Sequence, residues 1–298
     1  MNSKEAMNQD FMRVRDVTKH PEQYDNHKIY HTLTENGTAV LNQSPSSFQT
    51  CFSILGSFDQ GLNMISKGCT KLVLCDKNPL TYYHSKLCIG AISALSLNEY
   101  IDFRLVGTHP FQQKYLEKMN SYLEPDIRYF WKFLFQIHGA EELFQMIYEN
   151  AYQYYQKDLK PIICSYNSYL EPENYDFLKK QLLEKQVSFD YYFCDFLNLP
   201  ENVWKENYDE VYLSNILISP TKMDLPKYIH YLNQNIKPVI KPNGEIVSAY
   251  LANHQYYFLS KEEKKLLENN QYYEKEIICH TTLGSPYKEH IYTYQKRK

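Results

Sequence analysis

Short apolar runs alternate with amphipathic stretches in the first half of the chain. Residues 48–55 and 71–76 are apolar and β-rich, as buried strands are. A helical pattern follows each run: the first stops at Gly68, and the second begins near Asn78-Pro79, where proline suits the first helical position. This strand–helix–strand–helix order predicts a parallel sheet with helical crossovers.

The alternation returns in the second half of the chain, with one difference at its end. The expected strands, the first of them alternatively an extended link, are 161–166, 188–196, 209–217, 239–251, 272–282 and 289–295. The expected helices are 172–186, 225–234 and 261–270, and Pro242-Asn243-Gly244 should form a turn. Because no helix separates the last two strands, we predict a mixed sheet ending in an antiparallel hairpin, within an α/β, Rossmann-like fold.

Two segments fall outside this alternation. Residues 1–47 are polar and are expected to form an N-terminal cap, with short ordered pieces at 28–33 and 38–41, ahead of an α/β domain over 48–298. Residues 99–160 form a helical insertion dense in aromatics. Their helical spacing, for example Phe111, Tyr115, Met119 and Tyr122, fits either a groove for an apolar or aromatic acceptor or a subdomain that packs on itself. We favour the second reading because an apolar helix stripe usually lies in a core.

Charge and composition narrow the function classes. With 35 acidic and 32 basic residues the net charge is −3, so no nucleic-acid partner is expected, and the basic Lys296–Lys298 is taken as a solvated terminus. No apolar run approaches the roughly twenty residues of a membrane span, and no apolar signal core is seen. A cytoplasmic location with reduced cysteines is therefore expected. His27 and His31 share a metal-ligand spacing but lack a zincin glutamate, so no metal is expected.

Candidate chemistry begins where the first two strands end. Gly56 follows the first strand, where a glycine lets backbone approach a ligand and the next helix offers free N–H groups. The loop lacks the GxGxxG fingerprint of nicotinamide enzymes. Asp76 ends the second strand, where a carboxylate can accept both hydroxyls of a ribose. The alternative role for Asp76 is to cap the helix that begins near Asn78.

Later strands end in further polar residues. Asp195 could accept a hydrogen bond from an adenine amino group, and Ser214 and Asn215 end another strand. Ligands of open α/β sheets bind at the carboxyl ends of strands. We therefore expect these positions to share one crevice with Gly56 and Asp76.

Residues 56–95 resemble the cofactor-binding region of class I S-adenosylmethionine-dependent enzymes. More narrowly, the chain resembles the S-adenosylmethionine:diacylglycerol 3-amino-3-carboxypropyltransferase family, which makes diacylglyceryl homoserine. The resemblance covers residues 50–107 well and 165–250 more loosely, whereas the family's tryptophan-containing motif before the first strand has no counterpart. It rests on Asp76-Lys77-Asn78-Pro79, Lys86-Leu87, Gly107, Tyr169-Leu170, Asp195 and Leu213-Ser214-Asn215.

The resemblance implies a class I methyltransferase-like fold with S-adenosylmethionine as cofactor. It also suggests which residues would bind each part of the cofactor. In this interpretation Gly56, Ser57 and Gly61 cradle the methionine portion, Asp76 holds the ribose, Asp195 with Phe196 holds the adenine, and Ser214 and Asn215 face the reacting centre. Phe58 and Lys77 are also expected to bind the cofactor, with no part of it assigned to them. Asp59 either grips the cofactor amine or caps its own helix, and Tyr169 is a candidate general base.

The reaction itself stays open at this stage. The resemblance favours transfer of the aminocarboxypropyl group to a small-molecule or lipid acceptor, with peripheral membrane contact left open. The alternatives are methyl transfer and a catalytically inactive scaffold that keeps the fold. Oligomeric state and acceptor identity do not follow from the sequence.

Overall fold

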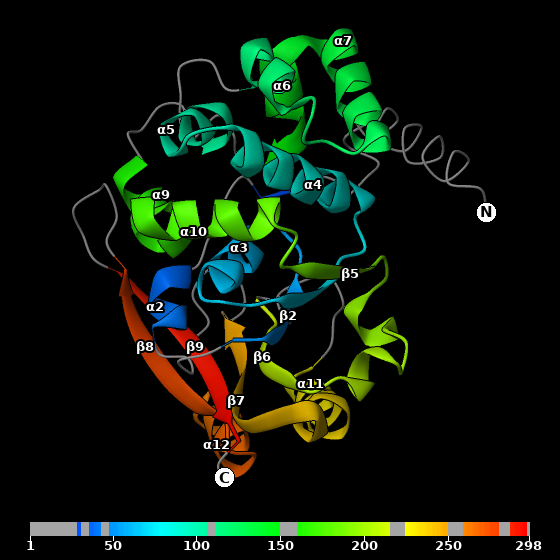
Figure 1. The fold of residues 1–298 in the computed structure, drawn as a ribbon. Helices are drawn as coiled ribbons and strands as arrows, with labels where there is room; N and C mark the ends of the chain where they lie inside the picture. Colours follow the sequence, from blue (N-terminus) through cyan, green and yellow to red (C-terminus); the bar gives the residue numbers. More distant parts are fainter. Residues whose placement is uncertain are drawn as a thin grey trace.

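The computed structural model describes residues 29–30, 36–42, 48–105, 111–149, 160–214, 224–249, 259–279 and 287–296 (Figure 1). Its centre is a seven-stranded sheet in the order β5-β3-β2-β6-β7-β9-β8. The strands are β2 Thr50–Ile54, β3 Lys71–Cys75, β5 Ser188–Tyr192, β6 Tyr208–Tyr212, β7 Ile240–Ala249, β8 Tyr273–Cys279 and β9 Tyr287–Gln295. Strands β5 to β7 in this order run parallel, and β9 is antiparallel to both neighbours. The predicted α/β mixed sheet with a terminal hairpin is confirmed.

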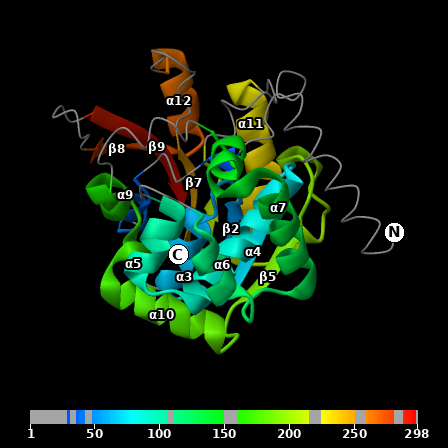
Figure 2. The ribbon, with the colours of Figure 1, turned by 90° about the horizontal axis from the view of Figure 1, so that it is seen from above.

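Both faces of the sheet are covered, which is why the central strands read as continuous apolar runs. Cys51 and Leu72 pack into one apolar cluster, whereas their chain neighbours Phe52 and Val73 pack into a second. The first cluster includes residues of α3 Asp59–Ser66, α4 Pro79–Ala94 and α10 Pro172–Leu183. The second includes residues of α11 Leu225–Tyr231 and α12 Lys261–Asn269. Figures 1 and 2 show these two helical layers on opposite sides of the sheet.

The ends of the predicted helices follow local capping chemistry. The Asn78 side chain accepts a hydrogen bond from the Leu80 N–H at 3.0 Å, and Pro79 occupies the first turn of α4. The chain leaves α3 at Gly68, whose φ of 102° is in the left-handed region. A capping box formed by Ser260 and Glu263 starts α12. The helix expected at 225–234 continues from α11 into η7 Leu232–Ile236 and η8 Lys237–Val239.

The insertion between α4 and β5 is helical, as predicted. It contains α5 Leu97–Tyr100, η2 Ile101–Leu105, α6 Gln113–Met119, α7 Pro125–Ile147, α9 Lys160–Tyr166 and η3 Ser168–Leu170. Phe111, Tyr115 and Met119 are buried in the main core, whereas Tyr122 is 47% exposed. Much of the aromatic stripe therefore packs inward. Helix α7 breaks at Gly139, where φ is 72° and ψ is 176°.

Short elements from the predicted N-terminal cap join this framework. Strand β1 Ile29–Tyr30 pairs in parallel with β4 Tyr148–Glu149 at the end of the insertion, and α2 Gly37–Leu41 lies near α3. Most of the cap, including His27 and His31, lies outside the described residues. Within the described part of the chain no helix is long and apolar enough to cross a membrane, and no cluster of metal-ligating side chains occurs.

Two local expectations were wrong. Residues 161–166, expected as a strand or extended link, belong to helix α9. A short apolar run fits either element, and Ile163 and Tyr166 are buried three residues apart, as on one helix face. Pro242-Asn243-Gly244 lies inside β7, at a register shift opposite Tyr208 and Glu210, rather than in a turn before it. Asn243 has a φ of 65° there, and a Cβ on Gly244 would lie 2.9 Å from the Asp209 carbonyl oxygen.

Candidate functional site at the carboxyl ends of the parallel strands

The residues that follow β2 and β3 contact each other through the backbone of Gly56, after β2, and the side chain of Asp76, after β3. Ile54 pairs with Cys75, so the residues that follow these strands leave the sheet side by side. The Asp76 carboxylate accepts hydrogen bonds from the Gly56 N–H at 3.1 Å and the Asn78 N–H at 2.9 Å. Asp76 thus joins the loop after β2 to Asn78, whose own side chain caps α4, so the alternative role of Asp76 as the helix cap was wrong.

Open space lies beside Gly56. Its φ is 46°, a conformation that favours glycine, and a Cβ built there would have no atom within 4 Å. Asp76 is only partly buried, so its carboxylate is not sealed in the core. Lys77 is exposed beside it. The backbone of the loop and the acid at the neighbouring strand end are therefore both accessible to a ligand.

The other predicted positions line the same edge of the sheet. Asp195 follows β5, is half-buried, and accepts the Leu197 N–H at 3.0 Å through Oδ1. Phe196 is buried among Phe52, Trp204 and Tyr231. Ser214 follows β6 with a φ of 48°, a strained conformation for a residue with a Cβ. Asn215 lies outside the described residues, as does Gly107.

The remaining loop positions point away from open space. A Cβ on Gly61 would lie 3.0 Å from both Leu72 and Phe58, so this glycine allows α3 to pack closely on β3. Phe58 precedes α3 with a φ of 70° and is buried against Phe189. Ser57 is 5% exposed. The sequence assigned Gly61 and Ser57 to the methionine portion of a cofactor and Phe58 to cofactor binding in general, yet of the two loop glycines only Gly56 borders empty space.

A buried ion pair behind this loop was missed by sequence reasoning. Arg104 in η2 is 1% exposed, and its Nη1 donates to Asp59 Oδ1 at 2.6 Å. The same nitrogen lies 3.0 Å from the hydroxyls of Tyr100 and Tyr169, and Nη2 donates to the Ser57 carbonyl at 2.9 Å. The Tyr169 hydroxyl also donates to Asp59 at 2.7 Å. The insertion thus supplies the counterion for the first turn of α3.

Charge on both partners of this pair is strongly favoured. Burial alone would raise the pKa of Asp59, but the Arg104 charge and hydrogen bonds from Arg104, Tyr169 and Ser57 hold it below its ordinary value. Burial alone would lower the pKa of Arg104, and Asp59 raises it well above the ordinary value. Burial raises the pKa of Tyr169 well above its ordinary value. A neutral, donating Tyr169 hydroxyl is what this network requires.

The geometry therefore separates two groups among the predicted residues. Asp76, Gly56, Asp195 and Ser214 lie at strand ends and are accessible, whereas Asp59 and Tyr169 have 0% exposed side chains and bind each other and Arg104. Partial loss of solvent around the Asp76 carboxylate raises its pKa, against hydrogen bonds from the Asn78 and Gly56 N–H groups that lower it. The sequence feature that could have indicated a buried role for Arg104 is its position between two apolar residues, Phe103 and Leu105.

Comparisons with known proteins find likeness of fold only. No family model matches the chain, and no curated protein matches it. Solved structures with a similar fold include the N-methyltransferase NodS from Bradyrhizobium japonicum with S-adenosylhomocysteine, at 8% identity and a TM-score of 0.45 over 97% of this chain and 99% of that one. The magnesium protoporphyrin IX methyltransferase ChlM from Synechocystis, with bound S-adenosylmethionine, is similar at 9% identity, a TM-score of 0.39, and 99% and 85% coverage.

A third structure with a similar fold is the 1,6-didemethyltoxoflavin-N1-methyltransferase from Burkholderia thailandensis. It is 11% identical, with a TM-score of 0.40 over 88% of this chain and 77% of that one. Likeness at this level does not assign a reaction.

Proposed function

We propose that this chain is a transferase that uses S-adenosylmethionine, bound at the carboxyl ends of β2, β3, β5 and β6. One observation carries the proposal: Asp76 lies in hydrogen-bond contact with the Gly56 backbone, beside open space. Ligands of open α/β sheets bind at this edge, where loops from neighbouring strands converge. The sequence resemblance of residues 56–95 points to the same cofactor.

The acceptor capacity of Asp76 fits the ribose of this cofactor. Each carboxylate oxygen has two acceptor positions. The Gly56 N–H uses one position on Oδ2 and the Asn78 N–H uses one on Oδ1, so the carboxylate would still have acceptor positions for a hydroxyl. A vicinal diol supplies two such donors, so the pair of backbone contacts would hold the carboxylate in the orientation that the diol needs.

Asp195 supports an adenine subsite in the same way. Its Oδ1 accepts the Leu197 N–H, which fixes the carboxylate near the end of β5. Its Oδ2 makes no hydrogen bond with the described residues and would accept an exocyclic amino group. Ser214 and Gly56 would then border the reacting end of the cofactor. Asp59 and Tyr169, which the sequence placed in the site, would act behind the loop by holding its conformation.

S-adenosylmethionine supplies a carbon activated by its sulfonium, so the protein has to align a nucleophile with that carbon and exclude water. We propose methyl transfer to a small molecule as the reaction, in line with the names of the three solved structures. Aminocarboxypropyl transfer is the second candidate, because Asp76-Lys77-Asn78-Pro79 resembles the corresponding stretch of that transferase family.

Binding and product analysis test the proposal in two steps. Calorimetric titration with S-adenosylmethionine should give saturable binding, and titration with NADH should give none. With a panel of amine, hydroxyl and thiol acceptors, S-adenosylhomocysteine as product indicates methyl transfer and methylthioadenosine indicates aminocarboxypropyl transfer. Binding without either product would favour a scaffold. Absence of saturable cofactor binding by the folded protein would overturn the proposal.

A further inference from the structure

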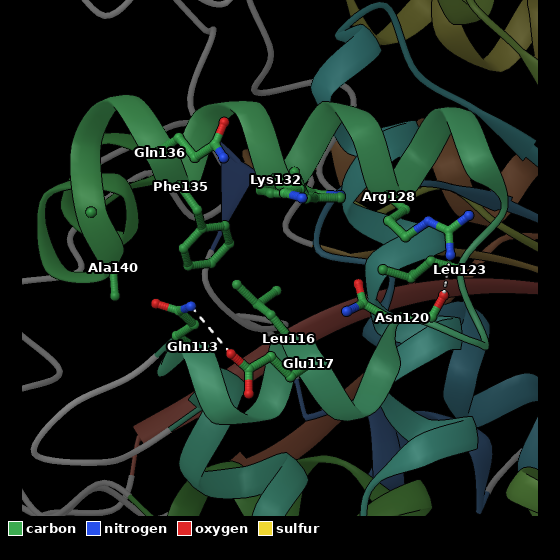
Figure 3. A pocket seen from close by; sticks show the side chains of 12 residues that line it. Gln113, Leu116, Glu117, Asn120, Leu123, Arg128, Lys132, Phe135, Gln136 and Ala140 are labelled. Carbon is green, nitrogen blue, oxygen red and sulfur yellow. Dashed lines mark hydrogen bonds between the residues drawn. The ribbon is translucent and has the colours of Figure 1, made fainter.

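A groove separates α6 from α7 in the helical insertion (Figure 3). It encloses about 430 Å³ and is lined by residues of both helices and of the turn between them. Small-molecule sites commonly have volumes of roughly 300–1,000 Å³ and a mostly apolar lining with a few polar groups. The sequence left a groove for an apolar or aromatic acceptor open as one reading of this segment, and the inward packing of its aromatic stripe does not fill this space.

Apolar side chains from both helices form part of the groove's surface. Leu123 and Trp131 are 8% and 1% exposed and form its inner part. Figure 3 shows Leu116 on α6 and Phe135 on α7 pointing toward each other across the gap. The Trp131 indole N–H already donates to the Tyr83 carbonyl at 3.0 Å, so the ring is fixed. An apolar body between these side chains would remove them from water.

Cations gather at one end of the groove. Arg128 and Lys132 lie one turn apart on α7 and line the pocket. Arg128 donates through Nη1 to the Asn120 carbonyl at 3.0 Å, and neither cation forms an ion pair within the part of the chain that the structure describes. The lining also contains one carboxylate, Glu117 on α6, which accepts from Gln113 at 3.2 Å. The lining therefore contains two cations and one carboxylate that already has a partner.

We propose that this groove binds a small amphipathic anion. Its aliphatic or aromatic body would lie between Leu116 and Phe135, and its carboxylate or phosphate head would pair with Arg128 and Lys132. Arginine and lysine both recognise such heads. This site is separate from the strand ends and does not depend on the transferase proposal.

Calorimetric titration of the full chain tests the ligand class. Octanoate has both parts of the proposed ligand, whereas octanol lacks the charge and acetate lacks the apolar body. We expect saturable binding of octanoate, binding of octyl phosphate in the same groove, and weak binding of octanol and acetate. Equal binding of octanol would overturn the charged part of the proposal. Absence of saturable octanoate binding would overturn the site.

Substitutions in the groove test whether octanoate binds there. The double variant Arg128→Gln/Lys132→Gln should bind octanoate at least about tenfold more weakly, a factor that corresponds to ~1.4 kcal/mol. The matched control, Lys261→Gln/Lys265→Gln on the exposed side of α12, removes the same charge far from the groove and should bind as the unmodified chain does. Leu116→Asn should also weaken binding, with circular dichroism confirming the fold. Equal losses in the groove and control variants would overturn the assignment to this groove.

Discussion

The Asp76 carboxylate accepts a hydrogen bond from the Gly56 N–H at 3.1 Å, linking two residues twenty positions apart in the sequence. The contact fixes the loop after β2 against the acid after β3 and leaves space beside Gly56. A single carboxylate therefore orders both sides of the proposed cofactor site. Substitutions of single residues can test this role through cofactor affinity and the free energy of unfolding.

Replacing Asp76 should weaken cofactor binding without unfolding the protein. Asp76→Ala removes a charged acceptor, and such hydrogen bonds contribute about 1.5–3 kcal/mol, which is roughly a 10- to 150-fold change in affinity. Titration with S-adenosylhomocysteine measures the loss. Asp126→Ala, on the exposed side of α7, is the control and should bind normally. Unchanged affinity in Asp76→Ala would remove this residue from the site.

The two loop glycines should respond differently to the same substitution. Gly56→Ala places a methyl group in the open space and forces a left-handed alanine, which costs about 1–2 kcal/mol of stability and should abolish tight cofactor binding. Gly61→Ala meets Leu72 and Phe58 and should cost about 1–3 kcal/mol of stability through overpacking, with affinity retained in the folded protein. Urea unfolding and calorimetry together distinguish the two. Identical behaviour would contradict the placement of the site at Gly56.

Replacing Arg104 should leave the buried Asp59 carboxylate without its counterion. We expect Arg104→Met to lower the free energy of unfolding by about 3–5 kcal/mol, because Asp59 is 0% exposed and loses its counterion. The double variant Asp59→Asn/Arg104→Met should recover part of this loss in a double-mutant cycle. Arg128→Met is the exposed control and should change little. Additive losses in the cycle would show that the pair does not couple.

Tyr169→Phe distinguishes a general base from a side chain that supports the loop. The hydroxyl donates to Asp59 and is 0% exposed, so its removal should cost about 1–3 kcal/mol of stability. Turnover per folded molecule should be retained well below the unfolding temperature. Complete loss of turnover in a folded Tyr169→Phe variant, measured with the acceptor that the panel identifies, would restore Tyr169 as the catalytic base.

Glu99 should make stability depend on pH in the acid range. Hydrogen bonds from Lys118 and the Ser96 N–H lower the pKa of Glu99 to about 2, from an ordinary value of 4.5. Because the folded-state pKa is the lower one, the stabilisation is present above pH 4.5 and is lost as the pH falls toward 2. The stability difference between the unmodified chain and Glu99→Gln should shrink across that window.

Elements that depend on local sequence were predicted well. The starts and stops at Gly68 and Asn78-Pro79 are decided by backbone conformation and side-chain capping within a few residues, which a sequence displays directly. The last two strands could be recognised as a hairpin because no helical pattern separates them. Residues 161–166 were misassigned because tertiary packing, rather than the local apolar run, decides between strand and helix there.

The accessible positions of the candidate site could be located from the strand ends in the sequence, whereas the contacts of its buried residues could not. Asp76 is found by its place after a buried strand, whereas the role of Asp59 depends on a guanidinium that comes from a different element. Sequence spacing carries no information on such a long-range contact. The same limit applies to Tyr169, which reaches Asp59 only because η3 folds back over α3.

The position of Arg104 also sets a limit on how this protein can be shortened. Excising residues 99–160 would keep every strand of the seven-stranded sheet. It would nevertheless delete Arg104, the only guanidinium that pairs with Asp59 among the residues that the structure describes. A trimmed chain would need a neutral residue at position 59 to fold. The insertion thus supplies the charge that the first turn of α3 needs behind the loop after β2.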